Sequence, residues 1–308
     1  MSETIVTVLM STYNGEKYLK EQLESIFNQS YSGMIKIFIR DDGSKDETID
    51  IIKHSLPKPN RAISLIEGNN IGPQRSFLEL IKISEGSDYY FFADQDDVWD
   101  LDKIDTAVQY MGAVKRPCVY CSNYRLSDAE LNILNSEFLK KEPVFSPLKI
   151  IFYNEIPGCT MGFNSALMKK LKELDIDNVM MHDSMVLSFG AFTGSIVYDP
   201  NSRITHRIHG SNVVGEGHAP IVLHKWVAEK IHLLFQKEDY SLSKMAEQFL
   251  ESMDKDTNLE YVQDLELLRD FKKSWKNTIQ LLKHPDSKNS LFDRTTLSIR
   301  CKILFHIF

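Results

Sequence analysis

The chain has 308 residues, of which 43% are hydrophobic and 26% are charged, as expected of a folded globular protein. Its formal net charge of -7 argues against a general nucleic-acid binder, whose affinity depends on an excess of Lys and Arg facing phosphates. Four cysteines do not make a disulfide framework, the first residues lack a secretion-signal pattern, and no apolar run reaches the roughly 18 residues of a membrane-spanning helix. We therefore expect a cytoplasmic protein with at most peripheral membrane contact.

Strands and helices alternate through the first part of the chain. Apolar runs predict strands over residues 5–11, 35–40, 63–67 and 89–93, and a fifth strand begins at Val119. Apolar residues at helical spacing follow the first strand (Leu19, Leu23, Ile26, Phe27) and precede the fourth (Phe77, Leu80, Ile81). Ser44 and Glu47 have the spacing of a capping box that would open the helix after the second strand. The alternation predicts an α/β fold with an open, mostly parallel sheet covered by helices on both faces.

Cys118 and Cys121 form a C-x-x-C pair within a segment that has a strand pattern. Residues three apart on a strand face opposite sides, so the two thiols should not meet. No second Cys or His pair follows at the spacing of a zinc site. We expect buried structural thiols, with a metal or redox site as the alternative.

A polar loop follows each of the first four predicted strands. These loops are residues 11–15, 41–44, 68–73 and 94–97. In an open parallel sheet the ligand lies beyond the carboxyl ends of the strands, near the point where the strand order reverses. The four loops therefore predict one ligand site at that edge.

The loop after the fourth strand carries Asp94, Asp96 and Asp97, three acidic residues within four positions. Carboxylates one residue apart at a strand end suit a hard divalent cation, Mg²⁺ or Mn²⁺, which in turn binds a diphosphate. A solvated loop, or a cap for a helix that starts near Asp100, is the alternative. Three acids so close together repel one another unless something positive lies among them, which favours the metal site.

Three ordered segments resemble the family 2 glycosyltransferases of the GT-A fold: STYNGEKYL from residue 11, IRDDGSKDET from residue 39 and FFADQDDVW from residue 91. The form DQDDVW, together with MHD at residues 181–183 and HRIHGSN at residues 206–212, is similar to the bacterial rhamnosyltransferase-like branch. The resemblance covers roughly residues 5–215. It implies a GT-A catalytic domain over residues 1–215 and leaves residues 216–308 as a C-terminal helical region.

The resemblance also implies roles for individual residues. The donor nucleotide pocket would contain Thr12, Tyr13, Asn14, Asp41, Asp42 and Asp94, with Asp41 facing the base and Asp94 near the ribose. Asp96 and His209 would hold the metal, and His206 has a weaker claim because a lone His is more often a packed residue. Further contacts with the donor or acceptor would come from Asp97, Trp99, Gly158, Cys159, Thr160, His182 and Arg207, the last through the diphosphate.

Asp183 matches the catalytic acid of the family's Glu-Asp pair, although His182 stands where the family has Glu. A carboxylate there suits a general base that takes the proton of the acceptor hydroxyl in an inverting transfer. The alternative is a helix N-terminus, since Asp and Ser are good capping residues. Both can hold at once.

The strand alternation stops after residue 220. A long amphipathic stretch over residues 265–282 places Leu268, Phe271 or Trp275, and Ile279 at helical spacing. Residues 290–308 mix basic and large apolar side chains, which predicts a helix that packs on the main domain or on a second subunit, or one that lies on the inner face of the membrane.

The sequence thus predicts a metal-dependent, inverting glycosyltransferase that moves one sugar from a nucleotide diphosphate to a cell-surface polysaccharide or lipid-linked glycan precursor. dTDP-L-rhamnose is the favoured donor by resemblance, and a UDP-linked galactose, glucose or N-acetylhexosamine is the alternative. A non-catalytic subunit that binds nucleotide sugars is the alternative of another class. A nicotinamide dehydrogenase is excluded because the loop after the first strand lacks G-x-G-x-x-G.

Overall fold

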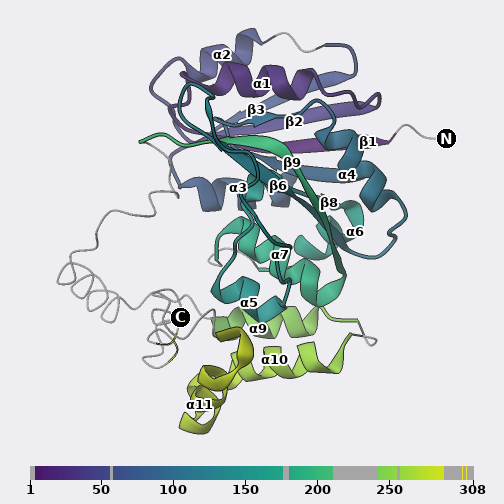
Figure 1. Cartoon of the computed structure of the whole chain (residues 1–308), viewed down its shortest axis with the longest axis vertical. Coiled ribbons are helices and arrows are strands. Elements are labelled where there is room, and N and C mark those ends of the chain that lie inside the picture. The colour runs from purple at the N-terminus through teal and green to yellow at the C-terminus, as the bar shows by residue number, and fades with distance from the viewer. Residues whose placement is uncertain are drawn as a thin grey trace.

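The computed structural model describes residues 4–55, 58–175, 180–210, 242–254 and 257–287, together with residues 300 and 303. Within these residues a nine-stranded sheet has the order β3-β2-β1-β4-β8-β6-β9-β5, with β7 paired to β6 (Figure 1). Helices cover both of its faces, as predicted.

Four parallel strands form the first half of the sheet. They are β1 (Ile5–Thr12), β2 (Met34–Asp41), β3 (Arg61–Glu67) and β4 (Tyr89–Ala93). This half confirms the four predicted strands. The last residues of β1, β2 and β3 are in register, because Thr12 pairs with Asp41 and Asp41 with Glu67. The loops that follow them therefore leave the sheet at one edge.

The second half of the sheet is mixed. Its strands are β5 (Val98–Trp99), β6 (Cys118–Ser127), β7 (Ile133–Asn135), β8 (Met161–Asn164) and β9 (Ser195–Arg207). β8 is antiparallel to β4 and β6, β9 is parallel to β6, and β5 is antiparallel to β9. The pairing of β5 with β9 sets Val98 opposite Thr205, so the end of β9 lies beside the acidic loop after β4.

Two apolar cores lie on opposite faces of the sheet (Figure 1). One contains α1 (Leu19–Phe27), α2 (Thr48–His54) and α4 (Lys103–Gly112). The other contains α3 (Pro73–Ile83), α5 (Pro147–Phe152), α6 (Ser165–Leu171) and α7 (His182–Thr193). Cys118 belongs to the first core and Cys121 to the second, and both are fully buried free thiols. The prediction of structural thiols on opposite sides of a strand is confirmed.

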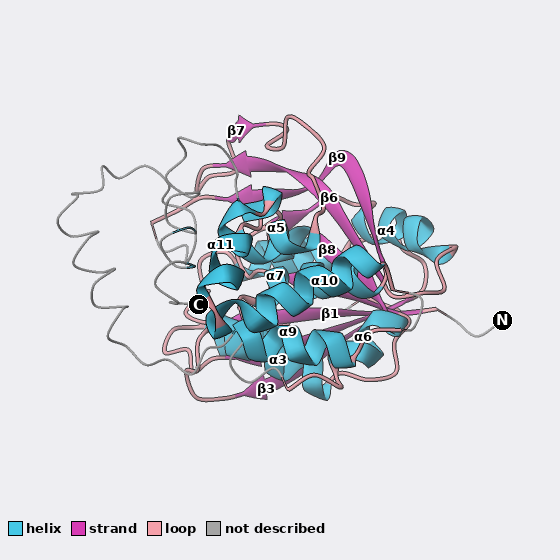
Figure 2. Cartoon of the chain, turned by 90° about the horizontal axis from the view of Figure 1, so that it is seen from below, coloured by secondary structure: helices cyan, strands magenta, loops and turns pink. Residues whose placement is uncertain are grey.

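The described C-terminal residues form α9 (Leu242–Glu251), α10 (Leu259–Asp270) and α11 (Trp275–Lys283). These helices lie beside α5 and α7 (Figure 1 and Figure 2). Their apolar residues continue the core of those helices, and the ring centroids of Phe189 and Phe249 are 4.7 Å apart. The predicted boundary at residue 215 and nearly all of residues 290–308 lie outside the described residues. None of the described helices has the length and apolarity to span a membrane.

The prediction of one amphipathic stretch over residues 265–282 is wrong in part. The helix breaks at η2 (Phe271–Lys273), and Ser274 starts α11 by accepting a hydrogen bond from the backbone N–H of Asn277. This break resets the buried face, so Trp275 and Ile279 are exposed.

Gly194, which precedes β9, has no room for a side chain. A Cβ there would come within 1.9 Å of the Pro117 carbonyl oxygen, a backbone atom. We expect Gly194→Ala to lower the free energy of unfolding by about 3 kcal/mol in urea titrations. Gly112→Ala is the control, because its nearest neighbour would be 4.0 Å away, and it should be neutral or stabilise by up to about 1 kcal/mol. Equal stability of Gly194→Ala and the parent chain would contradict this packing.

Candidate active site

The loops after β1, β2 and β4 are joined by hydrogen bonds. The backbone N–H of Asn14 donates to Ser44 Oγ and that of Lys45 to Asn14 Oδ1, each at 2.9 Å. Gln95 accepts from the backbone N–H of Tyr13 and donates to its carbonyl oxygen. The predicted convergence of these loops is therefore observed. Among them the Tyr13 ring is 47% exposed and is available to stack on a planar ligand.

Asp41 organises the turn after β2. Its Oδ1 accepts from the backbone N–H groups of Gly43 and Ser44, and its Oδ2 accepts from the hydroxyls of Thr12 and Ser44. Four hydrogen bonds use the acceptor capacity of a carboxylate. The predicted capping box is wrong, because Ser44 bonds to Asp41, and the backbone N–H of Thr48 at the start of α2 donates to Asp46 Oδ1 instead.

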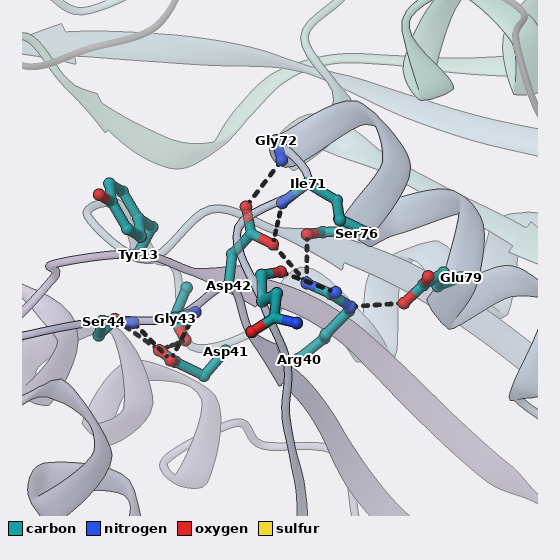
Figure 3. A network of polar contacts seen from close by, with 12 residues as sticks. Tyr13, Arg40, Asp41, Asp42, Gly43, Ser44, Ile71, Gly72, Ser76 and Glu79 are labelled. Carbon is teal, nitrogen blue, oxygen red and sulfur yellow. Dashed lines mark hydrogen bonds and ion pairs between the residues drawn. The ribbon is translucent and has the colours of Figure 1, made fainter.

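Asp42 forms a buried ion pair with Arg40 (Figure 3). Asp42 also accepts from the backbone N–H groups of Ile71 and Gly72, at 2.9 and 2.8 Å. Arg40 donates further to Ser76 and Glu79, both on α3. The pair therefore fixes the loop that leads into α3. Direct contact of Asp41 or Asp42 with a nucleobase stays a prediction, whereas their role in shaping the surrounding loops is observed.

The acidic loop after β4 is matched by positive groups from the end of β9. Asp97 is fully buried, and its Oδ1 lies 2.9 Å from His206 Nδ1 and accepts the backbone N–H of Arg207. Asp96 Oδ2 lies 2.8 Å from His209 Nε2. The expected positive charge among the acids is thus partly supplied by the chain itself, and His206 contributes more to the site than the sequence suggested.

The buried charges shift one another's pKa values. The Asp97 carboxylate raises the pKa of His206 to about 9, so this imidazole is a cation at neutral pH. Burial tends to raise the pKa of Asp97, but the charge and hydrogen bond of His206 outweigh it and lower that pKa. Burial and the neighbouring Asp97 and Asp96 raise the pKa of Asp94 to about 8. The charge of His206 lowers the pKa of Asp94 but does not outweigh these effects, so a metal ion or a cationic ligand group would further favour the ionised carboxylate.

The side chains fit a divalent metal at Asp96 and His209. Both are largely buried at a strand end, and a carboxylate oxygen with an imidazole nitrogen suits Mn²⁺ and is acceptable to Mg²⁺. The ligand atoms of Asp94, Asp97, Cys159 and His206 also lie within 4.8 Å of one another. That second group is less suited to a hard cation, because one of its ligands is a thiol and burial raises the pKa of Cys159 well above its usual range.

Arg207 holds the acidic loop in place. It is 2% exposed, and its Nε donates to the Asp96 carbonyl oxygen while its Nη2 pairs with Glu21 of α1. Its guanidinium stacks on Tyr18, whose ring is 4.8 Å from that of His209. The predicted contact with a diphosphate is not favoured by this arrangement, because the guanidinium is buried and directed at protein acceptors.

Asp183 lies in the first turn of α7, next to the turn η1 (Gly158–Thr160). A Cβ on Gly158 would come within 2.9 Å of His182 Nε2 and 3.3 Å of Asp183 Cβ. The charge of Asp183 contributes to the raised pKa of Asp94. The structure thus brings together the predicted base, the turn at residues 158–160 and the acidic loop.

Three of the predicted contact residues, Cys159, Thr160 and Trp99, have side chains whose polar atoms are buried. Cys159 and Thr160 are fully buried, and Thr160 Oγ1 donates to the Pro157 carbonyl. Trp99 is buried against Phe91. These residues lie on the short elements β5 and η1, whose side chains enter the core beneath the loops. They therefore support the loops and do not line the site.

Lys103 is a residue that sequence reasoning missed. It is fully buried, its Nζ donates to the Cys159 carbonyl oxygen at 3.0 Å, and it lies over the Trp99 ring. Burial lowers its pKa to about 8. Nothing in the sequence distinguishes this lysine from a surface lysine, since its burial depends on the packing of α4 under η1.

An α/β sheet with a buried acidic loop at its carboxyl edge and a further carboxylate nearby is compatible with the nucleotide-sugar transferase that the sequence predicts. The sequence profile of glycosyl transferase family 2 matches residues 7–174, more than half of the chain, and the chain belongs to this family. It is a glycosyltransferase of the GT-A fold that uses a nucleotide sugar.

Relatives and solved structures agree with this assignment. The chain is 31% identical over 217 residues to the dTDP-rhamnosyl transferase RfbG of Shigella flexneri, covering 67% of this chain and 73% of that protein. It is similar in structure to Staphylococcus aureus TarS 1-349 in complex with UDP-GlcNAc, with a TM-score of 0.59 at 17% identity over 99% of this chain and 82% of that chain. It also resembles the mannosyltransferase PcManGT from Pyrobaculum calidifontis in complex with GDP-Man and Mn²⁺, with a TM-score of 0.51 at 15% identity over 98% of this chain and 84% of that one.

Removing Arg40 should test how strongly the buried pair supports the loops. We expect Arg40→Met to lower the free energy of unfolding by about 3–5 kcal/mol, because it leaves Asp42 charged and buried. Lys53→Met is the matched control, since the Lys53–Glu67 pair has side chains that are 53% and 50% exposed, and its loss should cost at most about 1 kcal/mol. Urea titrations of both variants measure these losses. Equal losses would show that the buried Arg40–Asp42 pair stabilises the fold no more than an exposed pair does.

The pH dependence of the free energy of unfolding should show the lowered pKa of His182. Burial lowers its pKa to about 4, against about 6.5 in an unfolded chain. Between these two values the unfolded chain binds a proton that the folded chain does not, so stability falls as the pH falls from about 6.5 to about 4. Relative to His182→Phe, the parent chain should lose up to about 3 kcal/mol over this range. A difference between the two proteins that stays constant from pH 7 to pH 4 would contradict the assignment.

Proposed function

We propose that this glycosyltransferase is a metal-dependent, inverting enzyme that transfers a single sugar from a nucleotide diphosphate. The observation that carries the proposal is that carboxylates from two different elements lie near one edge of the sheet. Asp94 and Asp96 lie on the loop after β4, and Asp183 reaches the same region from α7. The first set suits the diphosphate side of a donor and the second suits the acceptor.

Asp183 would act as the general base. It would remove the proton from the acceptor hydroxyl while that oxygen attacks the anomeric carbon from the face opposite the leaving nucleotide diphosphate. One carboxylate is sufficient for this step, and no covalent enzyme intermediate is required. Asp183 Oδ1 accepts the backbone N–H of Ser184 at 2.6 Å, which orients the carboxylate at the start of the helix.

Asp96 and His209 would hold a Mg²⁺ or Mn²⁺ ion, which when bound neutralises charge on the departing diphosphate. Tyr13 and the backbone of the loops around Asn14 would bind the nucleotide, with Thr12, Asp41 and Asp42 keeping those loops in shape. Holding the two substrates in line contributes a large part of the acceleration in such transfers.

dTDP-L-rhamnose is the donor that we favour, because a relative with 31% identity is described as a dTDP-rhamnosyl transferase. UDP-linked hexoses stay as the alternative, since a structure with the same fold was solved with UDP-GlcNAc. The acceptor that we propose is a cell-surface polysaccharide or lipid-linked glycan precursor, reached from the cytoplasmic side of the membrane, with self-association through the C-terminal helices as a further option. A non-catalytic subunit is the rival proposal, and its expected signature is donor binding without turnover.

Two substitutions should separate the two sets of carboxylates. Asp183→Asn should lower turnover by about 10²–10⁴-fold while the dissociation constant of the donor stays near that of the parent chain, because a base acts on the acceptor. Asp96→Asn should abolish turnover and also remove the metal dependence of donor binding.

Transfer assays and calorimetric donor titrations, each with and without Mn²⁺ or Mg²⁺, provide the measurement. Asp175→Asn is the control, because Asp175 is a surface carboxylate that pairs with Lys244. Substantial activity in Asp183→Asn would show that the assigned base is wrong.

A further inference from the structure

His182 occupies an aromatic slot directly beside the proposed base. Its ring stacks on Phe77, with centroids 4.0 Å apart and planes 23° apart, and it meets the edge of Phe92 at 4.7 Å. Only 5% of the residue is exposed. The face contact with Phe77 and the edge contact with Phe92 restrict the ring plane, and the ring is oriented with Nε2 on the side of Gly158.

The two ring nitrogens have different surroundings. Nδ1 is buried and has no hydrogen-bond partner in the part of the chain that the structure describes. Nε2 is on the side of Gly158, where even a methyl group would be 2.9 Å away. A bare acceptor nitrogen is less costly to bury than an unpaired N–H. The favoured tautomer therefore has its proton on Nε2.

The imidazole is neutral under ordinary conditions. Burial lowers its pKa to about 4, and the opposing influence of Asp183, the titratable group beside it, is smaller. Neutrality has a consequence for the whole site, which already holds Asp94, Asp96 and Asp183. A further carboxylate at position 182 would repel these groups, whereas a neutral ring adds a hydrogen-bond donor without adding charge.

We propose that His182 is a specificity-determining residue whose Nε2–H donates a hydrogen bond to a hydroxyl oxygen of the sugar being transferred. This inference rests on the proposed function. The donor sugar is assigned over the acceptor because Phe92, which holds the ring edge-on, lies two residues before Asp94, on the donor side of the site. Glycine at position 158 leaves Nε2 uncovered by a side chain there, since a Cβ would lie 2.9 Å from this nitrogen.

The tautomer can be measured directly by nitrogen-15 NMR of the full chain, with the His182 signals assigned by their loss in His182→Phe. We expect a neutral ring protonated on Nε2 from pH 8 to about pH 5. The titration uses Mg²⁺, because Mn²⁺ is paramagnetic and would broaden the signals. Addition of dTDP-L-rhamnose should shift the Nε2–H signal, and addition of dTDP without the sugar should not. A proton on Nδ1, or an imidazolium at pH 7, would overturn the inference whether or not any nucleotide sugar binds.

Binding constants provide the second arm. His182→Gln keeps an N–H in nearly the same place. The ratio of the dTDP to the dTDP-L-rhamnose dissociation constant should therefore be the same in this variant as in the parent chain. In His182→Phe, which keeps the stacking, the ratio of the dTDP to the dTDP-L-rhamnose dissociation constant should fall about 3- to 10-fold, with dTDP binding unchanged. UDP and UDP-GlcNAc form the second ligand pair.

An unchanged ratio in His182→Phe would overturn the inference while leaving the proposed function intact. Equal weakening of dTDP and dTDP-L-rhamnose would assign His182 a structural role only, which also overturns it. Failure of the parent chain to bind any of the four ligands would instead count against the proposed function, and the tautomer measurement would still decide the state of the ring.

Discussion

The buried contact between Asp97 and His206 is the interaction on which the site depends. Three carboxyl groups within four residues can be brought into a low-dielectric strand end only if cations accompany them or a proton neutralises one of them. His206 reaches Asp97 because β9 runs parallel to β6 and pairs with β5 directly after the acidic loop. Arg207, the next residue, fixes the Asp96 backbone. The end of one strand therefore stabilises the loop that follows another strand more than a hundred residues earlier.

In this arrangement the negative charge of the acidic loop is only partly balanced by cations of the protein. Asp97 is paired directly with His206, whereas His206 only partly offsets the burial and the acidic neighbours that raise the pKa of Asp94 to about 8. A site of this kind favours ligands that bring positive charge with them, such as a diphosphate that carries a divalent metal ion. A neutral His182 next to Asp183 limits the negative charge on the other side. Both features favour a metal-loaded nucleotide diphosphate over a bare anion.

The parallel half of the sheet could be predicted because its signals are local. Apolar runs, turn residues and helical spacing are each contained in a short window, so four strands and the loops after them were located correctly. The mixed half could not be predicted, because the insertion of β8 between β4 and β6 depends on which strands pair. The capping box failed for a related reason: Ser44 had a better partner in Asp41, which a short window does not reveal as an acceptor for four donors.

The same distinction applies to the site. Asp94, Asp96 and Asp183 were identified by their order along the chain, and the structure places them at one edge of the sheet. The roles of His206, Arg207 and Lys103 follow from burial and pairing, which are properties of the folded chain. Trp99 was expected at the ligand and lies in the core, since a residue type does not show on which side of a two-residue strand it falls.

A thermal-shift panel of nucleotide sugars, each with and without Mn²⁺ or Mg²⁺, tests the central claim most directly. A ligand that binds only the folded chain stabilises it by about 2.7 kcal/mol at a hundred times its dissociation constant. We predict that one nucleotide diphosphate sugar raises the melting temperature only when metal is present, and that its plain diphosphate does nearly the same. If no nucleotide diphosphate shifted the transition with either metal, the acidic edge at Asp94 to Asp97 would not be a functioning donor site.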